Sequence, residues 1–195
     1  MTMYILAGGC DRKYPEYATQ LGRVVHAKIA RPRILSCGFA QDDERAEQKF
    51  PQYRDFFAKY FGEYESFIKA EKSQFIEQIR EADVVYFHGG RTSLLLDEMQ
   101  KYPDIQQEFA GKIIIGSSAG ANYLSSYCWA STKGEMGLAG GVLNVATVVH
   151  YGSTGFEEFT FDQAYWDKAV AKVREVSGRD EIILLPEGTF TVIER

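Results

Sequence analysis

The sequence predicts one α/β domain, residues 1–195, with a mostly parallel sheet and helices on both of its faces. Three observations support this prediction. Short apolar runs of strand length alternate with longer segments whose apolar residues recur at three- and four-residue spacing. Two of the short runs end in glycine pairs, as tight strand-to-helix connections do. A chain of 195 residues can bury a full core without disulfides or metals.

The first half of the chain contributes two strands and three helices. The predicted strands are Met3–Ala7 and Arg33–Cys37, and the predicted helices are 16–29, 45–61 and 66–80. Each strand is a short apolar run, and each helix carries apolar residues on one face. Pro51 should break the middle helix or begin a new one, because proline lacks the amide hydrogen that a helix interior needs.

The second half continues the alternation of strands and helices. The predicted strands are 83–87, 112–115, 146–150 and a final pair, 182–185 and 189–193, around the turn Pro186-Glu187-Gly188; the predicted helices are 92–101, 121–127 and 165–176. Thr92 is the expected N-cap of the first of these helices. Strands separated by helices favour a parallel sheet, and ligands of such sheets gather beyond the carboxyl ends of the strands.

Composition limits the partners that we expect. The formal net charge is −5, with 22 Lys and Arg against 27 Asp and Glu, which argues against nucleic acid. No export signal and no membrane-length apolar stretch is visible, so we expect a cytoplasmic protein without a membrane partner. Cys10, Cys37 and Cys128 are too few and too widely spaced for a disulfide framework or a zinc site. We expect neither a metal nor a cofactor, and the oligomeric state stays open.

The segment Gly116-Ser117-Ser118-Ala119-Gly120 is the most informative motif of the chain. It follows the run Ile113-Ile114-Ile115 and precedes a helix-like stretch, which is the context of a nucleophile elbow, G-x-S-x-G. Glycines on both sides allow the strand and the helix to pack backbone against backbone. Only Ser118 has glycine two residues before it and two residues after it, so it is the better candidate nucleophile. A plain turn with a capping serine is the alternative explanation of the motif alone.

A serine hydroxyl needs a base, and the chain has three histidines. His26 lies inside a predicted helix and is expected to be structural. His88 and His150 both end predicted strands, and we favour His150 because a base at a strand end on the same edge as the elbow can reach the serine. Glu135 is the single carboxylate between Ser118 and His150, and it is the first candidate for the acid that orients the imidazole. The reserve candidates are Glu157, Glu158 and Asp162.

Backbone amides are expected to bind the oxyanion of the tetrahedral intermediate. The N–H of Ala119 directly follows the candidate nucleophile. The second donor should come from a neighbouring loop, and Gly89-Gly90 fits because glycine lets a backbone N–H approach a substrate closely. Neighbouring positions of the third and fourth strands in the sheet would support this pair of donors, because the two loops would then lie close together.

These residues resemble the dipeptidase E (aspartyl dipeptidase) family of serine peptidases. The resemblance rests on the elbow with its trailing Ala121-Asn122, on Gly89-Gly90-Arg91-Thr92 and on Leu185-Pro186-Glu187-Gly188, and it spans residue 80 to the C-terminus. It implies the class I glutamine amidotransferase-like fold, with flavodoxin-like layering and a serine in place of that fold's cysteine. It also implies Ser118 as the nucleophile, His150 as the base, and Gly90 and Ala119 as oxyanion donors.

Three positions depart from the family pattern. Arg91 stands where asparagine is usual, Val149-His150-Tyr151 replaces Pro-His-Phe, and Gly134-Glu135-Met136 stands for Asn-Asp-Met. Glu135 therefore matches the acid of the family, one methylene longer. The preference of the family for an N-terminal aspartate does not carry over, although Arg91 is a candidate contact for a substrate carboxylate.

The resulting hypothesis is a serine exopeptidase that hydrolyses dipeptides or short peptides through an acyl-enzyme. A small peptide is the expected partner. Elbow and triad serve acyl transfer in general, so an esterase or an amidase acting on another small substrate is an alternative. A non-catalytic binding protein on the same scaffold is the other alternative, because function varies freely on one fold.

Overall fold

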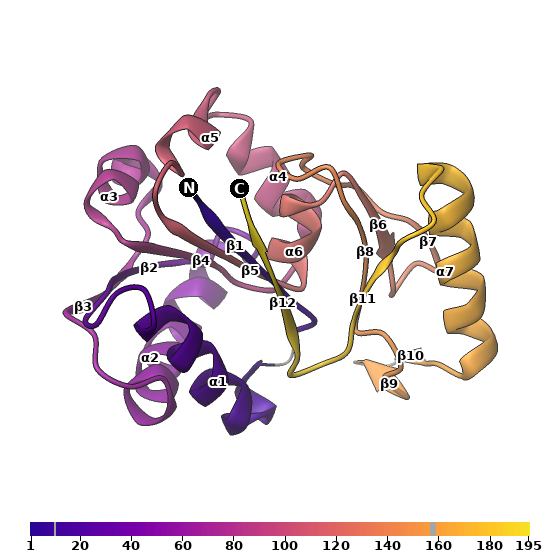
Figure 1. The fold of residues 1–195 in the computed structure, drawn as a ribbon, viewed down its shortest axis with the longest axis horizontal. Helices are drawn as coiled ribbons and strands as arrows, with labels where there is room; N and C mark the ends of the chain where they lie inside the picture. The colour runs from indigo at the N-terminus through magenta and orange to yellow at the C-terminus, as the bar shows by residue number, and fades with distance from the viewer. Residues whose placement is uncertain (10, 157–158) are drawn as a thin grey trace.

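The computed structural model describes residues 1–9, 11–156 and 159–195, and a six-stranded sheet forms its centre (Figure 1). The strands, in spatial order, are β12 (Phe190–Glu194), β1 (Met3–Ala7), β5 (Ile113–Ser117), β4 (Val84–Phe87), β2 (Arg33–Cys37) and β3 (Ser66–Lys69). All neighbours are parallel except β12, which runs antiparallel to β1. The predicted mostly parallel sheet is therefore confirmed.

Helices cover both faces of this sheet, as predicted. The helices are α1 (Pro15–His26), α2 (Asp43–Tyr60), α3 (Phe75–Glu81), α4 (Thr92–Met99), α5 (Ile105–Glu108) and α6 (Ala119–Leu124), with short 3₁₀ turns η1 (Asp11–Lys13) and η2 (Lys72–Gln74). Figure 1 shows α1 and α2 on one face and α3 to α6 on the other. The layering follows from side-chain alternation along strands.

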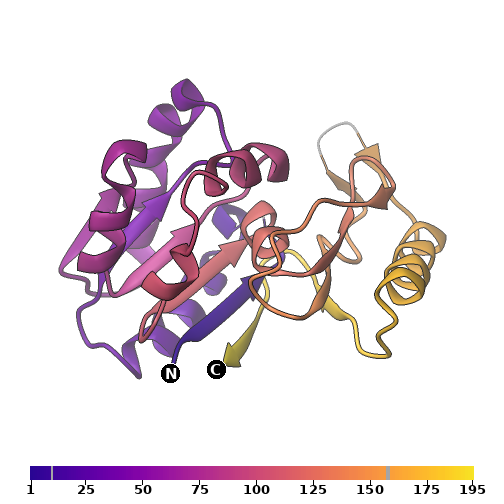
Figure 2. The same ribbon diagram turned by 90° about the horizontal axis from the view of Figure 1, so that it is seen from above.

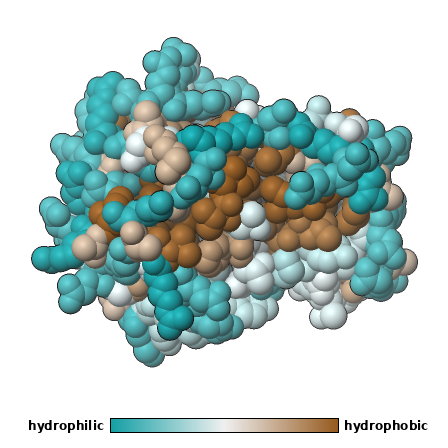
Figure 3. All heavy atoms as spheres, in the orientation of Figure 1, coloured by the Kyte–Doolittle hydropathy of each residue, from teal (hydrophilic) through white to brown (hydrophobic). Residues whose placement is uncertain are grey.

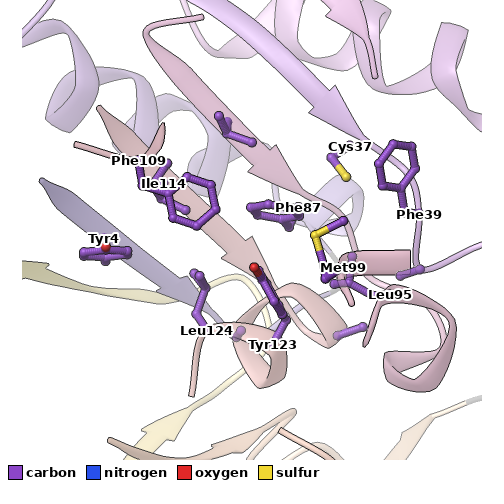
Figure 4. Packing of buried hydrophobic residues seen from close by; sticks show 14 of the residues in the cluster. Tyr4, Cys37, Phe39, Phe87, Leu95, Met99, Phe109, Ile114, Tyr123 and Leu124 are labelled. Atoms are coloured by element: carbon purple, nitrogen blue, oxygen red, sulfur yellow. The ribbon is translucent and has the colours of Figure 1, made fainter. Parts of the chain in front are cut away.

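The alternation is clear in β4. Val84 and Tyr86 pack with α1 and α2, whereas Val85 and Phe87 pack with the helices of the opposite face. In Figure 4, Phe87 lies at the centre of this second cluster, and its ring centroid is 5.1 Å from that of Tyr123 in α6. The space-filling view shows apolar residues as a band across the middle of the molecule, at the level of the strands (Figure 3). Strands that are buried on both faces explain the continuous apolar runs in the sequence.

A second sheet lies beside the first (Figure 2). Its strands, in spatial order, are β11 (Ile183–Leu185), β8 (Ala146–Val149), β6 (Tyr127–Ala130) and β7 (Glu135–Met136). Strand β8 is parallel to β11 and to β6, and the helix α7 (Gln163–Ser177) packs on the sheet through buried Trp166 and Val173. The short strands β9 (Gly155–Phe156) and β10 (Phe159–Thr160) form an antiparallel pair.

Four expectations about elements were wrong. The segment 66–80 is not one helix, because its beginning pairs with β2 as the edge strand β3 and only α3 is helical. Helix α2 runs through Pro51, since it also buries Phe56 and Phe57 against the sheet. The last two strands do not pair with each other, because β11 joins β8 and β12 joins β1. Arg91, and not Thr92, is the residue that precedes α4 at its N-cap.

The carboxyl ends of β1, β5, β4 and β2 meet at one edge of the central sheet. Gly8-Gly9, Ser118, Gly89-Gly90 and the turn 38–41 follow these ends in the chain. This edge is where an open α/β sheet usually binds its ligand. Among the residues that the structure describes, no helix has both the length and the apolar character needed to cross a bilayer.

Candidate active site

Ser118 occupies a strained turn between β5 and α6. Its backbone angles are φ 51° and ψ −106°, which a non-glycine residue rarely adopts. The flanking glycines permit this turn. A Cβ on Gly116 would lie 2.5 Å from the backbone of Gly120, and a Cβ on Gly120 would lie 2.3 Å from the carbonyl oxygen of Phe87. Ser118 is only partly buried, whereas neighbouring Ser117 is 1% exposed, so the turn presents the second serine.

His150 lies against the hydroxyl of Ser118. The distance between Ser118 Oγ and His150 Nε2 is 2.9 Å. The other ring nitrogen, Nδ1, lies 3.0 Å from Oε1 of Glu187. A carboxylate only accepts hydrogen bonds, so Nδ1–H donates to Glu187 and Nε2 is left to accept the hydroxyl proton of Ser118. The three side chains form a chain of hydrogen bonds with the polarity that activates a serine.

The second sheet supplies both partners of Ser118. His150 follows the end of β8, and Glu187 follows the end of the parallel neighbour β11, where Leu185 is in register with Val149. Parallel neighbours end at the same edge, so the residues beyond their ends lie close together. The side chains of His150 and Glu187 are only 5% and 9% exposed, which shields their hydrogen bond from water.

The loop after β1 joins the two sheets at the site. The N–H of His150 donates to the Gly8 carbonyl at 3.2 Å, and the N–H of Gly188 donates to the Gly9 carbonyl at 3.1 Å. Gly9 has φ +101°, and a Cβ on it would lie 2.6 Å from Cε1 of His150 and 3.0 Å from Cβ of Ser118. Glycine is therefore required here, because any side chain would displace the imidazole.

The structure does not bring Glu135 to His150. Glu135 is exposed on β7, where it pairs with Ala130. Asp162, a reserve candidate, is the N-cap of α7 and accepts a hydrogen bond from the N–H of Tyr165. The other reserve candidates, Glu157 and Glu158, lie outside the described residues.

Sequence reasoning missed Glu187 because it took the last two strands as a hairpin. Strand β11 instead ends beside β8, and this places the residue after Pro186 at the imidazole. The signal that could have found Glu187 was its position just after an apolar strand, in the segment Leu185-Pro186-Glu187-Gly188.

The expected oxyanion donors follow two neighbouring strands. β4 pairs with β5, with Phe87 opposite Gly116, so the loop Gly89-Gly90 lies next to the elbow. A Cβ on Gly89 would lie 3.2 Å from Cβ of Ser118 and 3.7 Å from its Oγ. Ala119 is the first residue of α6 and follows Ser118 directly.

Arg91 lies on the surface just beyond this loop. Its side chain is 68% exposed, and Nη2 lies 3.7 Å from a carboxylate oxygen of Asp42. Asp42 caps α2, and the hydrogen bond from the N–H of Arg45 is the main cause that lowers the pKa of Asp42. An exposed pair at this distance is weak, so the guanidinium is available to other anions.

The other two histidines have structural surroundings. His88 is 1% exposed, its Nε2 lies 2.7 Å from Oγ of Ser36, and its ring stacks on Tyr53. Burial lowers the pKa of His88 to about 3, so it is neutral near pH 7. His26 lies with its ring nitrogens 3.3 and 3.4 Å from the carbonyl oxygens of Phe61 and Ile29.

Two comparisons with known proteins gave matches. The model of peptidase family S51 matches residues 34–195. A solved structure of a protein from Listeria monocytogenes EGD-e, described as a candidate peptidase E, has a TM-score of 0.63 and 18% sequence identity. That match covers 100% of this chain and 99% of the other, and it shows the shared α/β fold. No match was found among curated proteins.

Proposed function

Because the chain belongs to peptidase family S51 and is a serine peptidase, we propose that it is an exopeptidase that hydrolyses dipeptides or short peptides through an acyl-enzyme. The observation that carries this proposal is the continuous hydrogen-bond chain from Ser118 Oγ through the imidazole of His150 to Glu187. Nucleophile, base and orienting acid then have the order that acyl transfer requires.

In the acylation step, Nε2 of His150 takes the hydroxyl proton while Oγ of Ser118 bonds to the carbonyl carbon of the scissile peptide. The carbonyl electron pair moves to oxygen, which gives a tetrahedral oxyanion. When the carbonyl re-forms, the C–N bond breaks and the imidazolium gives its proton to the leaving amine. Water then attacks the ester by the same route, so the acid product leaves and Ser118 regains its proton.

Glu187 takes the role of orienting acid that the sequence suggested for Glu135. Its contact with Nδ1 fixes the tautomer in which Nε2 is the proton acceptor, and its charge stabilises the imidazolium formed during attack. The low exposure of this pair strengthens the electrostatic effect.

Gly90 and Ala119 are the proposed oxyanion donors. Their loops flank Ser118, and backbone N–H groups held by a sheet edge and a helix start need little reorganisation during attack. Arg91 is the proposed contact for a substrate carboxylate, since it directly follows Gly90 and carries an exposed charge.

Labelling with a fluorophosphonate, followed by mass spectrometry of the modified peptide, tests this function together with a panel of dipeptides and aminoacyl-anilides. We expect one adduct, at Ser118, and hydrolysis of peptide substrates that Ser118→Ala lowers by roughly six orders of magnitude. The matched control is Ser73→Ala, which changes an exposed serine away from the site. Labelling that persists in Ser118→Ala would contradict the proposal.

A further inference from the structure

The turn 38–41, which follows β2, lies against the loop Gly89-Gly90-Arg91. The N–H of Arg91 donates to the carbonyl of Ala40 at 2.7 Å. Gly90 approaches the same carbonyl so closely that a Cβ on it would lie 2.3 Å from that oxygen. The turn itself is closed by the N–H of Gln41, which donates to Gly38 at 2.9 Å. The turn 38–41 therefore helps to fix the conformation of the loop Gly89-Gly90-Arg91. Among the described residues, this turn makes no hydrogen bond to Ser118.

The side chain of Gln41 is hydrogen-bonded to one peptide group of this loop. Its Nε2 donates to the carbonyl oxygen of Gly89 at 2.9 Å. Gln41 is 6% exposed, and its other amide atom, Oε1, is buried without a hydrogen-bond partner among the described residues. The reverse amide orientation would set two acceptor oxygens against each other. Nε2 also lies 3.5 Å from the hydroxyl of Tyr53, a longer contact. Gln41 thus keeps the short hydrogen bond to Gly89 while it leaves Oε1 unsatisfied, which argues that the contact with Gly89 has a function.

The carbonyl of Gly89 and the N–H of Gly90 belong to the same peptide unit. Peptide bonds in the described residues are trans, so the two groups point in opposite directions. A donor that holds the carbonyl on one side therefore directs the N–H to the other side.

Gln41 lines a cavity of about 350 Å³ together with His88 and Ser36, and Ser118 does not line this cavity. The Ser118 side chain instead lies beside Gly89.

We propose that Gln41 is a positioning residue that aims the Gly90 N–H at the oxyanion by holding the Gly89 carbonyl. This inference rests on the proposed function, because it needs a tetrahedral intermediate at Ser118. Without the amide donor, the Gly89-Gly90 peptide loses the hydrogen bond that fixes its carbonyl, so the Gly90 N–H is less well oriented toward the oxyanion. The chemistry of Ser118 and His150 is otherwise unchanged.

The test compares Gln41→Met, Gln41→Glu and the control Gln20→Met, which changes an exposed glutamine on α1. Methionine keeps the length of the side chain but removes the donor, and glutamate sets a carboxylate against the Gly89 carbonyl. The measurements are the rate constant and the final extent of fluorophosphonate labelling, and kcat and KM for a hydrolysed peptide. We expect Gln41→Met to lower the rate constant and kcat by roughly 10- to 100-fold at little change in KM, with Gln41→Glu lower still.

The extent of labelling separates positioning from folding. If a variant is partly unfolded, a smaller fraction of the protein is labelled when the reaction is complete. If the Gly90 N–H is only misdirected, all of the protein is labelled, but the rate constant of labelling is lower. Rates for both Gln41 variants within twofold of Gln20→Met, with the unaltered protein labelled at Ser118, would overturn this inference and leave the proposed function intact. Absence of any labelling of the unaltered protein would overturn both.

Discussion

Glu187 Oε1 lies 3.0 Å from His150 Nδ1, although 37 residues separate them in the chain. The contact arises because each residue follows one of two adjacent parallel strands, β11 and β8. Glu187, and not Glu135, is therefore the carboxylate that is hydrogen-bonded to the imidazole.

Glu187→Gln should lower kcat by roughly 10⁴-fold, because an amide does not hold the imidazole in the required tautomer or stabilise its charge. Glu135→Gln is the matched control, since the same atoms change on an exposed strand. We expect that control to stay within twofold of the unaltered protein. Steady-state hydrolysis of one peptide by all three proteins is the measurement. A larger loss in Glu135→Gln than in Glu187→Gln would reverse the assignment.

Gly9→Ala should abolish most activity, because the new Cβ would lie 2.6 Å from His150 Cε1. We expect a loss of at least roughly 100-fold, since small displacements of catalytic groups have effects of that size. Gly152→Ala is the control: it has φ +75°, lies two residues from His150, and has nothing within 4 Å of a built Cβ. That control should lose only about 1–2 kcal/mol of stability from backbone strain. Equal activity in the two variants would argue against the role of Gly9.

Arg91→Gln should raise KM for peptides with a free carboxylate by roughly 2- to 5-fold, the range expected for one exposed ion pair. The value of kcat should change little, because this contact is made equally in the ground state and the transition state. Arg54→Gln, also an exposed arginine, is the control. The measurement is KM for a dipeptide and for the same dipeptide with a C-terminal amide. An equal increase in KM for both substrates would show that Arg91 does not bind the carboxylate.

His88 should make the protein less stable in acid. Burial lowers the pKa of His88 from 6.5 to about 3, so between these pH values the unfolded chain binds a proton that the folded chain does not. Stability from this group is complete above about pH 6.5 and declines as the pH falls toward 3, by up to roughly 1.4 kcal/mol per pH unit. Urea unfolding of the unaltered protein and of His88→Gln from pH 7 to pH 5 measures the slope. We expect a shallower decline in the variant, and parallel curves would show that His88 is not the cause.

Much of the central sheet could be predicted from local sequence. Strands β1 and β2 have the predicted limits, because both are short, mainly apolar segments that are followed directly by glycine. The segment 66–69 was expected to be helical, and only its pairing with β2 makes it a strand. Apolar spacing in a short window does not distinguish an edge strand from the start of a helix.

The site could be predicted only in part. The elbow is local, so the sequence could indicate Ser118 and the oxyanion loops. Glu187 depends on the pairing of β11 with β8, a contact between segments that are distant in the chain. Choosing an acid by its place between serine and histidine cannot capture such a contact. Gln41 was missed for the same reason, because its partner Gly89 is 48 residues away.

Ser118 follows a strand of one sheet, and His150 and Glu187 follow strands of the other, with the carbonyls of Gly8 and Gly9 among the hydrogen-bonded contacts between them. Val149 and Leu185 of the second sheet pack in one buried cluster with Phe87 of the first, so loosening of this shared cluster would separate the hydroxyl from the imidazole. On gradual warming, peptide hydrolysis should therefore stop at temperatures where the helical circular dichroism signal is still unchanged, and activity should return on cooling. Catalysis in this architecture reports on how the sheets are docked rather than on whether the chain is folded.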